Sequence, residues 1–201
     1  HIGHTELGEH ARRALHDRAV LALVPAARSP FKADGPTADG RTRTALLELA
    51  FADNPHARMW TEELARAQAA PDAPSYFIDT IRAARAQLGD QVPLWFLIGS
   101  DQAFALDRWR HAGEIVALAT PLVLARGEDR GTTRQRLQRP PLAVLFGQEP
   151  RIVEAPLIEV SSTRVRDALA RREPPPGLGH EVERYILARG LYIPPPSETP
   201  G

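Results

Sequence analysis

The chain has 201 residues and a mass of 22.1 kDa, which suits one compact domain, and its hydrophobic share of 43% is enough to bury a core. Its 25 basic and 25 acidic side chains cancel, so no overall field would hold it to nucleic acid or an anionic membrane, and any phosphate affinity must be local. The absence of cysteine excludes disulfides, thiolate metal sites and cysteine nucleophiles. No apolar run approaches the ~20 residues of a membrane span, and no secretory segment opens the chain, so we expect a soluble cytoplasmic protein. The sequence does not predict its oligomeric state.

The first elements in chain order are a helix, a strand and a long irregular loop. Apolar residues at helical spacing predict a helix over 5–16, and the continuous apolar run 19–24, which stops at Pro25, predicts a strand buried on both faces. The segment 26–40 has no period and contains Lys32, the only lysine. Its length makes it a candidate functional loop.

Helices and strands alternate along the rest of the chain. Apolar patterns predict helices over 41–52, 74–88, 164–171 and 180–189, strands near 58–61, 94–98 and 121–125, and one more strand between 142 and 158. The alternation predicts an α/β fold, a Rossmann-like doubly wound parallel sheet covered on both faces. We expect a single domain over 1–192 and a disordered proline-rich tail over 193–201. In such a sheet, ligands bind beyond the carboxyl ends of the strands.

Two histidines and a glycine, His1, Gly3 and His4, stand at the start of the first helix. A glycine there lets the backbone approach a ligand closely, and a helix N-terminus offers unpaired N–H groups at the positive end of its dipole. Imidazoles donate hydrogen bonds to phosphoryl oxygens and can stabilise the charge of a transition state. The motif therefore predicts a phosphate site. Taken alone, it could also be a chance arrangement or the remnant of an affinity tag.

A second helix start of the same design lies late in the chain. Ser161, Ser162 and Thr163 bring three hydroxyls to the beginning of the helix, and Arg166 follows one turn later. Hydroxyls and free N–H groups can hold phosphate oxygens there, and the arginine can add a bidentate contact. The alternative is ordinary N-capping followed by a solvated arginine. Because it is paired with the histidine motif, this segment predicts the second half of one phosphate-binding site.

These motifs together resemble the nucleotidyltransferase superfamily, in particular the bacterial nicotinate-mononucleotide adenylyltransferases. The resemblance rests on the HxGH motif, on an apolar strand that ends in Gly99-Ser100-Asp101, and on the S-S-T-x-x-R helix start. Similar stretches, from His1 to about Tyr192, are 24–32, 43–50, 74–80, 108–110 and 182–192.

The resemblance implies a reaction between two nucleotides. The phosphate of nicotinate mononucleotide would attack the α-phosphorus of ATP, forming nicotinate adenine dinucleotide and releasing pyrophosphate, as a step of NAD biosynthesis. No protein nucleophile is required, so catalysis would consist of positioning and charge stabilisation. The implied cofactor is Mg²⁺, carried by the phosphates of ATP and by water, with no metal site on the protein.

The resemblance also assigns roles to individual residues. It implies catalytic roles for His1, His4 and Arg166, ATP phosphate binding by Ser161, Ser162, Thr163 and Lys32, ribose binding by Gly99 and Asp101, and nicotinate binding by Ser75, Tyr76, Phe77 and Trp109. Other roles stay open: Lys32 could be a solvated loop residue, Asp101 a helix cap, and the aromatic residues could serve packing. Trp109 lies among charged neighbours, which is unusual for a core residue and favours the binding role.

The sequence departs from the family pattern at several positions. The family's first strand and its G-G-(S/T)-F-D-P turn, which precede HxGH, are missing from this chain. Because that strand is central in the sheet, we expect the natural protein to carry at least ~10 more residues upstream. Phe77 replaces the usual threonine, Phe31 the usual histidine, and Arg110 the usual aromatic residue after Trp109. These changes weaken the assignment of the acceptor more than that of the chemistry.

Three other functions compete with this one. An adenylyltransferase for nicotinamide mononucleotide or phosphopantetheine is the nearest, although the Pro-Ser-Tyr segment and Trp109 argue against phosphopantetheine. A class I aminoacyl-tRNA synthetase fragment also carries a HIGH motif, but it would need a lysine-rich loop, and Lys32 is the only lysine. A non-catalytic nucleotide-binding protein also stays open.

Overall fold

Helices and strands alternate along the part of the chain that the computed structural model describes, residues 1–27, 38–71, 73–125, 129–156 and 158–193. In chain order the elements are α1 (Ile2–Leu15), β1 (Leu21–Leu23), α2 (Gly40–Ala50), β2 (Ala57–Met59), α3 (Glu62–Ala69), α4 (Phe77–Leu88), β3 (Trp95–Gly99), α5 (Ser100–Ala103), the 3₁₀ helix η1 (Leu106–Arg108), α6 (Ala112–Leu118), β4 (Thr120–Ala125), α7 (Arg130–Leu137), α8 (Ala143–Phe146), β5 (Arg151–Glu154), α9 (Ser162–Ala170) and α10 (His180–Ala188). Each predicted helix and strand is found, with its ends shifted by a few residues. No helix in these ranges is long and apolar enough to cross a bilayer.

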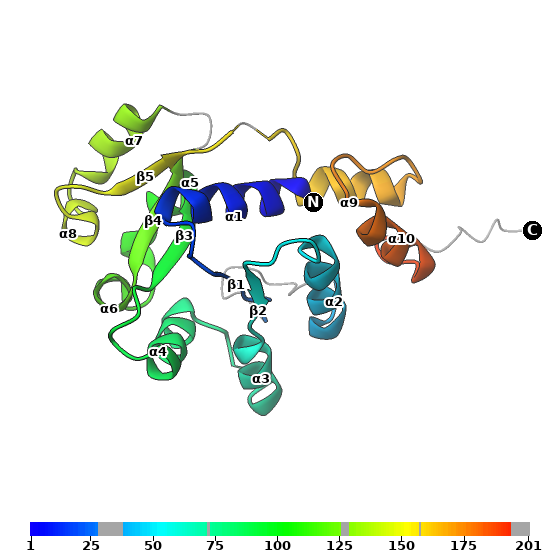
Figure 1. The fold of residues 1–201 in the computed structure, drawn as a ribbon, viewed down its shortest axis with the longest axis horizontal. Helices are drawn as coiled ribbons and strands as arrows, with labels where there is room; N and C mark the ends of the chain where they lie inside the picture. The colour runs from blue at the N-terminus through cyan, green and yellow to red at the C-terminus, as the bar shows by residue number, and fades with distance from the viewer. Residues whose placement is uncertain (28–37, 72, 126–128, 157, 194–201) are drawn as a thin grey trace, which may run out of the picture.

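The strands form two parallel sheets (Figure 1). In the smaller sheet β1 pairs with β2, with Leu21 opposite Ala57. In the larger sheet β4 lies between β3 and β5, with Leu122 opposite both Leu97 and Arg151. Parallel strands need crossover connections, and helices supply them here. The arrangement agrees with the doubly wound class that the alternation predicted.

The larger sheet is covered by helices on both faces. On one face, Phe96 and Val123 pack in a core cluster with residues of α4, α6 and α7. On the other face, Leu122 and Leu124 pack against Leu7 of α1. Because successive side chains of a strand point to opposite faces, these two clusters bury both sides of the sheet.

Strand β1 differs from its prediction. The apolar run predicted a strand buried on both faces, but Ala22 is exposed and Val20, just before the strand, is 61% exposed. The prediction was wrong because an apolar run shows what a strand can bury, whereas its neighbours decide what is covered. In the described residues, β1 pairs with β2 alone and approaches α1, where a Cβ on Gly8 would lie 3.0 Å from Leu21.

The last two helices pack against α2, far from them in the sequence. Val165 and Leu169 of α9 form a cluster with Ile186 of α10, and Leu46 and Leu49 of α2 lie against it. Apolar contacts of this kind fix the position of α9, and with it the position of the Ser161 segment at its start.

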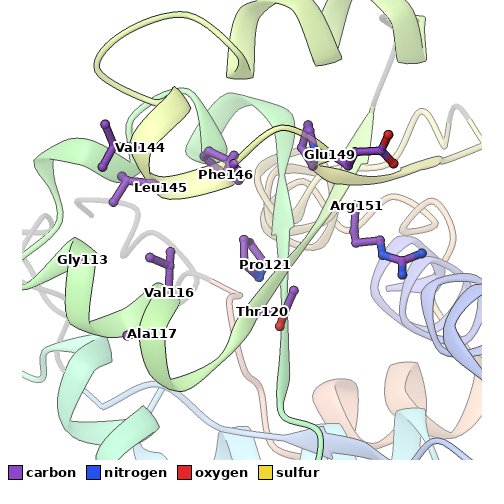
Figure 2. A pocket seen from close by; sticks show the side chains of 12 residues that line it. Gly113, Val116, Ala117, Thr120, Pro121, Val144, Leu145, Phe146, Glu149 and Arg151 are labelled. Atoms are coloured by element: carbon purple, nitrogen blue, oxygen red, sulfur yellow. The ribbon is translucent and has the colours of Figure 1, made fainter.

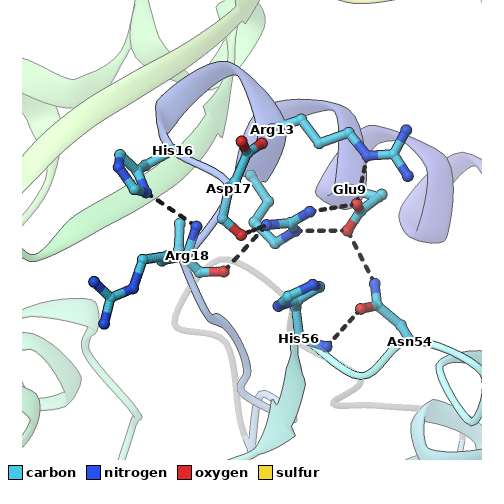
Figure 3. Close-up of polar contacts among 9 residues, drawn as sticks. Glu9, Arg13, His16, Asp17, Arg18, Asn54 and His56 are labelled. Atoms are coloured by element: carbon cyan, nitrogen blue, oxygen red, sulfur yellow. Dashed lines mark hydrogen bonds and ion pairs between the residues drawn. The ribbon is translucent and has the colours of Figure 1, made fainter.

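A polar network ties α1 to the segment before β2 (Figure 3). The Glu9 carboxylate accepts hydrogen bonds from Arg12 at 2.8 Å, Arg13 at 2.7 Å and Asn54 at 3.1 Å. Arg12 is only 7% exposed and also donates to the carbonyl oxygen of Asp17. The hydrogen bond from Arg12, above all, lowers the pKa of Glu9 to about 2, so the carboxylate stays charged beside its buried partner.

We expect the substitution Glu9→Gln to lower the free energy of unfolding by about 2 kcal/mol, because the nearly buried Arg12 would lose its charged partner. Chemical denaturation at pH 7 measures this change. Glu6→Gln is the matched control, since Glu6 is exposed on the same helix, and it should change stability by less than about 0.5 kcal/mol.

The same carboxylate makes stability depend on pH. The pKa of Glu9 falls from its ordinary 4.5 to about 2 on folding, so its contribution is complete above pH 4.5 and is lost as the pH falls toward 2. As the pH falls from 4.5 to 2, the free energy of unfolding should decrease less in Glu9→Gln than in the unchanged protein. Parallel stability curves for the two proteins would contradict the assignment.

Candidate functional site

The starts of α1 and α9 lie next to each other (Figure 1). The backbone N–H of Ile2 donates to the carbonyl oxygen of Gly177 at 2.8 Å. A Cβ on Gly177 would lie 2.9 Å from Val160 and 3.0 Å from Ile2, so the Gly177 turn is wedged between the two helix starts. On the α1 side, a Cβ on Gly3 would lie 3.7 Å from Ile158. The tertiary structure thus brings the two predicted phosphate motifs together.

The two histidines stack at the start of α1. The ring centroids of His1 and His4 are 4.2 Å apart, and the ring planes differ by 27°. A Cβ on Gly3 would approach two ring atoms of His1 to 3.0 Å, so the glycine leaves room for that imidazole. The Nδ1 atom of His1 is buried without a hydrogen-bond partner among the described residues. Buried polar atoms normally have partners, so this ring nitrogen is an exception among the described residues.

The start of α9 carries hydroxyls and a guanidinium. Ser161 caps the helix, because its Oγ accepts a hydrogen bond from the backbone N–H of Arg164 at 3.2 Å. Thr163 and Arg166 are exposed one turn apart, and Arg166 donates to the Thr163 hydroxyl at 3.5 Å. Ser161 therefore acts as an ordinary N-cap in this structure, while its hydroxyl hydrogen can still be donated to another acceptor. Ser162 is half-buried between the cap and Thr163 and belongs to the same helix end.

The C-terminal segment places a tyrosine near Arg166. Burial raises the pKa of the Tyr192 phenol, while the nearby guanidinium groups of Arg166 and Arg43 act in the opposite direction. Arg43 is itself partly buried, which lowers its pKa, and its Nε donates to the carbonyl oxygen of Ala38 at 3.0 Å. Residues of α2, α9 and the chain after α10 therefore converge behind the α9 start.

An aromatic group forms around the start of α4. The Phe77 ring lies edge-on to Trp109, with centroids 5.4 Å apart, and the guanidinium of Arg110 lies 4.5 Å from the centroid of the Tyr76 ring. Tyr76 is the N-cap residue of α4, and the half-buried Ser75 precedes it. Trp109 also packs against the core, so it takes part in packing as well as in this group. The structure thus joins two stretches that are separate in the sequence.

The two ribose candidates lie at the carboxyl end of β3. Gly99 ends the strand and is the N-cap residue of α5, so the alternative in which Asp101 caps the helix is wrong. Asp101 is exposed, and its carboxylate accepts a hydrogen bond from Gln102 at 3.3 Å. Carboxyl ends of parallel strands meet at one edge of the sheet, the edge from which the chain leaves β5 toward α9.

The remaining candidate, Lys32, falls outside the described residues.

A cavity of about 380 Å³ lies at the opposite edge of the sheet (Figure 2). It includes Thr120 and Arg151, the first residues of β4 and β5, so it faces the amino ends of the strands. A wider cavity of about 690 Å³ runs along α1 beside the Glu9 network. Because ligands of doubly wound sheets bind at carboxyl ends, the first cavity is not the nucleotide site.

The side chains at the two helix starts suit phosphate oxygens better than a metal ion. They offer imidazole, hydroxyl, guanidinium and N–H groups, whereas Mg²⁺ prefers carboxylate, phosphate and water oxygens. Within the described ranges, no group of three or more histidine or acidic side chains is placed to hold a metal. The groups at the two helix starts are therefore chemically suited to bind an anion.

A family model described as "Cytidylyltransferase-like" matches residues 1–168. The chain belongs to the cytidylyltransferase-like family. This family membership confirms the nucleotidyltransferase class that the HxGH and S-S-T-x-x-R motifs predicted.

Relatives within the cytidylyltransferase-like family share one name. Over 197 aligned residues the chain is 31% identical to a "Probable nicotinate-nucleotide adenylyltransferase" of Moorella thermoacetica, covering 96% of this chain and 87% of the relative. Over 213 residues it is 33% identical to the protein of the same name in Stenotrophomonas maltophilia, covering 97% and 92%. These similarities extend over nearly the whole chain, and the predicted resemblance to this group is confirmed.

Two solved structures are similar in fold to this chain. A Plasmodium falciparum nicotinic acid mononucleotide adenylyltransferase complexed with NaAD has a TM-score of 0.65 at 13% identity, covering 94% of this chain and 89% of that one. The same protein complexed with APC gives a TM-score of 0.64 at the same identity and coverage. At this identity the likeness concerns the fold, and it confirms the predicted α/β class.

Two residues beside these groups, Gly177 and Arg110, have no predicted role from the sequence. Gly177 has a φ of 60°, a left-handed conformation that favours glycine, and its place after three prolines is the signal that could have marked it. In the sequence Arg110 stands out as a departure from the family and as a charged neighbour of Trp109, but its position over Tyr76 depends on a contact between distant residues that the sequence does not display.

We expect Gly177→Ala to destabilise the protein by about 2 kcal/mol, because a side chain there meets both a positive φ and the tight contacts with Val160 and Ile2. Urea unfolding measures the loss. Gly89→Ala is the matched control, since Gly89 also has a positive φ, of 72°, but a Cβ there has no neighbour within 4 Å, and backbone strain alone should cost about 1 kcal/mol. Equal stabilities of the two variants would show that the Gly177 turn does not hold the helix starts together.

Proposed function

We propose that the protein transfers the adenylyl group of ATP to nicotinate mononucleotide, giving nicotinate adenine dinucleotide and pyrophosphate in NAD biosynthesis. The observation that supports the proposal is the meeting of the α1 and α9 starts, because these helix ends carry His1 and His4 on one side and Ser161 to Arg166 on the other. The names of the relatives with which the chain shares 31% and 33% identity support this choice of reaction.

The reaction is a displacement at phosphorus. A phosphate oxygen of the mononucleotide attacks the α-phosphorus of ATP, a new P–O bond forms, and the bond to the β-phosphate oxygen breaks as pyrophosphate leaves. The protein supplies no nucleophile, so its contribution is to hold the two reactants in line and to stabilise the charge that develops. Positioning alone can contribute about 7–11 kcal/mol to such a reaction.

We assign the phosphate end of this reaction to the two helix starts. The imidazoles of His1 and His4 donate to the α- and β-phosphates, and Ser161, Ser162 and Thr163 hold the triphosphate at the start of α9. Helix N-termini stabilise anions through free N–H groups and the positive end of the helix dipole. Arg166 adds a guanidinium for the departing pyrophosphate, to which it can bond in a bidentate manner.

We assign the acceptor end to the aromatic group at the start of α4. Trp109, Tyr76 and Phe77 would contact the pyridine ring, and backbone N–H groups from Ser75 onward would take its carboxylate. Phe77 has no hydroxyl, so only backbone donors of this segment remain for that contact. The T-shaped pair of Phe77 and Trp109 supports a binding surface for a flat ring.

The remaining assignments concern ribose, the loop lysine and the metal. Gly99 and Asp101 would bind ribose, because a carboxylate at this edge of the sheet can accept hydrogen bonds from its hydroxyls. Lys32 would lie near the transferred phosphates. Mg²⁺ would be carried by the phosphates of ATP and by water, supplying charge neutralisation. Residues 1–192 would act as one catalytic unit, since Tyr192 lies near Arg166.

Pyrophosphate release by the full-length protein, measured with ATP, Mg²⁺ and one mononucleotide at a time, tests the proposal. We expect release that depends on nicotinate mononucleotide. Pyrophosphate release with only nicotinamide mononucleotide, or with only phosphopantetheine, would show that this compound is the acceptor instead. ATP binding without turnover of any acceptor would overturn the proposal in favour of a non-catalytic nucleotide-binding protein.

We expect Arg166→Ala to lower kcat about 100-fold or more, because a charge-stabilising donor for the phosphates would be lost. The fold should stay intact, since the Arg166 side chain is exposed, and a thermal unfolding curve checks this. Arg171→Ala is the matched control, because Arg171 is an exposed arginine at the other end of α9. Unchanged turnover in Arg166→Ala would remove the triphosphate role from this helix.

A further inference from the structure

An arginine lies over the aromatic group at the start of α4. Arg110 follows Trp109 in the segment between η1 and α6, and its guanidinium carbon is 4.5 Å from the centroid of the Tyr76 ring. A guanidinium that stacks on an aromatic ring is attracted by the electrons of the ring face. Arg110 therefore has a defined position although it is exposed.

In the described part of the chain, no carboxylate forms an ion pair with Arg110. The neighbouring carboxylate of Glu114 is occupied by Arg82, which donates two hydrogen bonds of 2.7 Å to it. His111 approaches the same carboxylate at 3.9 Å.

The arginine also stands beside the ring-binding surface of the proposed acceptor site. Tyr76 precedes Phe77 in the chain and Arg110 follows Trp109, so the Arg110–Tyr76 pair borders the Phe77–Trp109 pair. A flat ring that contacted the second pair would lie beside the residues that carry the guanidinium, so its substituents could approach this charge. A carboxylate on the ring would carry a full negative charge to this guanidinium, whereas a carboxamide would be neutral.

We propose that Arg110 is a specificity-determining residue, which makes the acceptor site prefer a pyridine ring with a carboxylate over one with a carboxamide. This inference rests on the proposed function. Its physical basis is that a guanidinium forms strong charge-assisted hydrogen bonds with a carboxylate, in bidentate geometry where the approach allows it. Because stacking on Tyr76 already holds the Arg110 side chain in place, the side chain loses less conformational entropy when a ligand binds. More of the interaction energy with the carboxylate then contributes to the preference for the acid over the amide.

The test compares kcat/KM for nicotinate mononucleotide and nicotinamide mononucleotide in the unchanged protein and in Arg110→Gln, at saturating ATP and Mg²⁺. We expect Arg110→Gln to lower kcat/KM for the acid about tenfold, mostly through KM, because ground-state binding of the carboxylate is lost. The value for the amide should change less than about twofold, since the amide has no charge to pair.

Two further variants separate charge from packing. Arg110→Lys keeps the charge without the planar guanidinium, and we expect its preference for the acid to stay at least about threefold above that of Arg110→Gln. Arg108→Gln removes an exposed arginine from the end of η1, and both mononucleotides should react as they do with the unchanged protein.

The outcomes distinguish this inference from the proposed function. An equal fall in kcat/KM for both mononucleotides in Arg110→Gln would make Arg110 a packing residue and overturn the inference. Unchanged kcat/KM values for both mononucleotides would overturn it as well. If the unchanged protein turned over neither mononucleotide, the proposed function itself would be wrong, independently of any Arg110 variant.

Discussion

The contact between the starts of α1 and α9 is the constraint on which the candidate site depends. Each helix start by itself is a weak anion site, worth about 1 kcal/mol or less at an exposed position. Their junction at Gly177, with the Ile2 N–H bonded to its carbonyl oxygen at 2.8 Å, places the two helix starts side by side, as the proposed phosphate site requires. The rest of the structure keeps the two helices in these positions. The Glu9–Arg12 network anchors α1, and the apolar cluster with α2 and α10 anchors α9.

The two proposed ends of the site lie on helices that cover opposite faces of the larger sheet. On one face α1 packs against β4, and its start carries the two stacked histidines of the proposed phosphate end. On the other face α4 packs against the sheet, and its start carries Tyr76 and Phe77 of the proposed acceptor end. Because burial on both faces fixes each helix along its length, the two helix starts are held by the core rather than by their loops. The ligand groups can then be polar and partly exposed without losing their positions.

The sequence predicted the main elements well and several short helices not at all. The patterns of β3 and α4 were strong because their apolar residues are buried, as Phe96 and Ile78 are. The helix α7 was missed because it is polar along its length and buries only Thr133 and Leu137, so it shows no apolar period. Its position follows from packing beside β5, a contact between residues distant in the chain. For the same reason the burial of β1 was predicted wrongly.

The sequence by itself determined which chemical groups are present. Two imidazoles beside a glycine, a run of hydroxyls before an arginine, and a Gly-x-Asp after an apolar strand are local patterns, and local patterns can be read from spacing. Only the tertiary structure decided which of these groups meet. It brought residues 2 and 177 into hydrogen-bonding contact and placed Arg110 over Tyr76. It also set Arg12 and Asn54 as hydrogen-bond donors to the Glu9 carboxylate. The physical reason is that such contacts depend on the packing of the whole core, and no stretch of sequence records the distance between two helices.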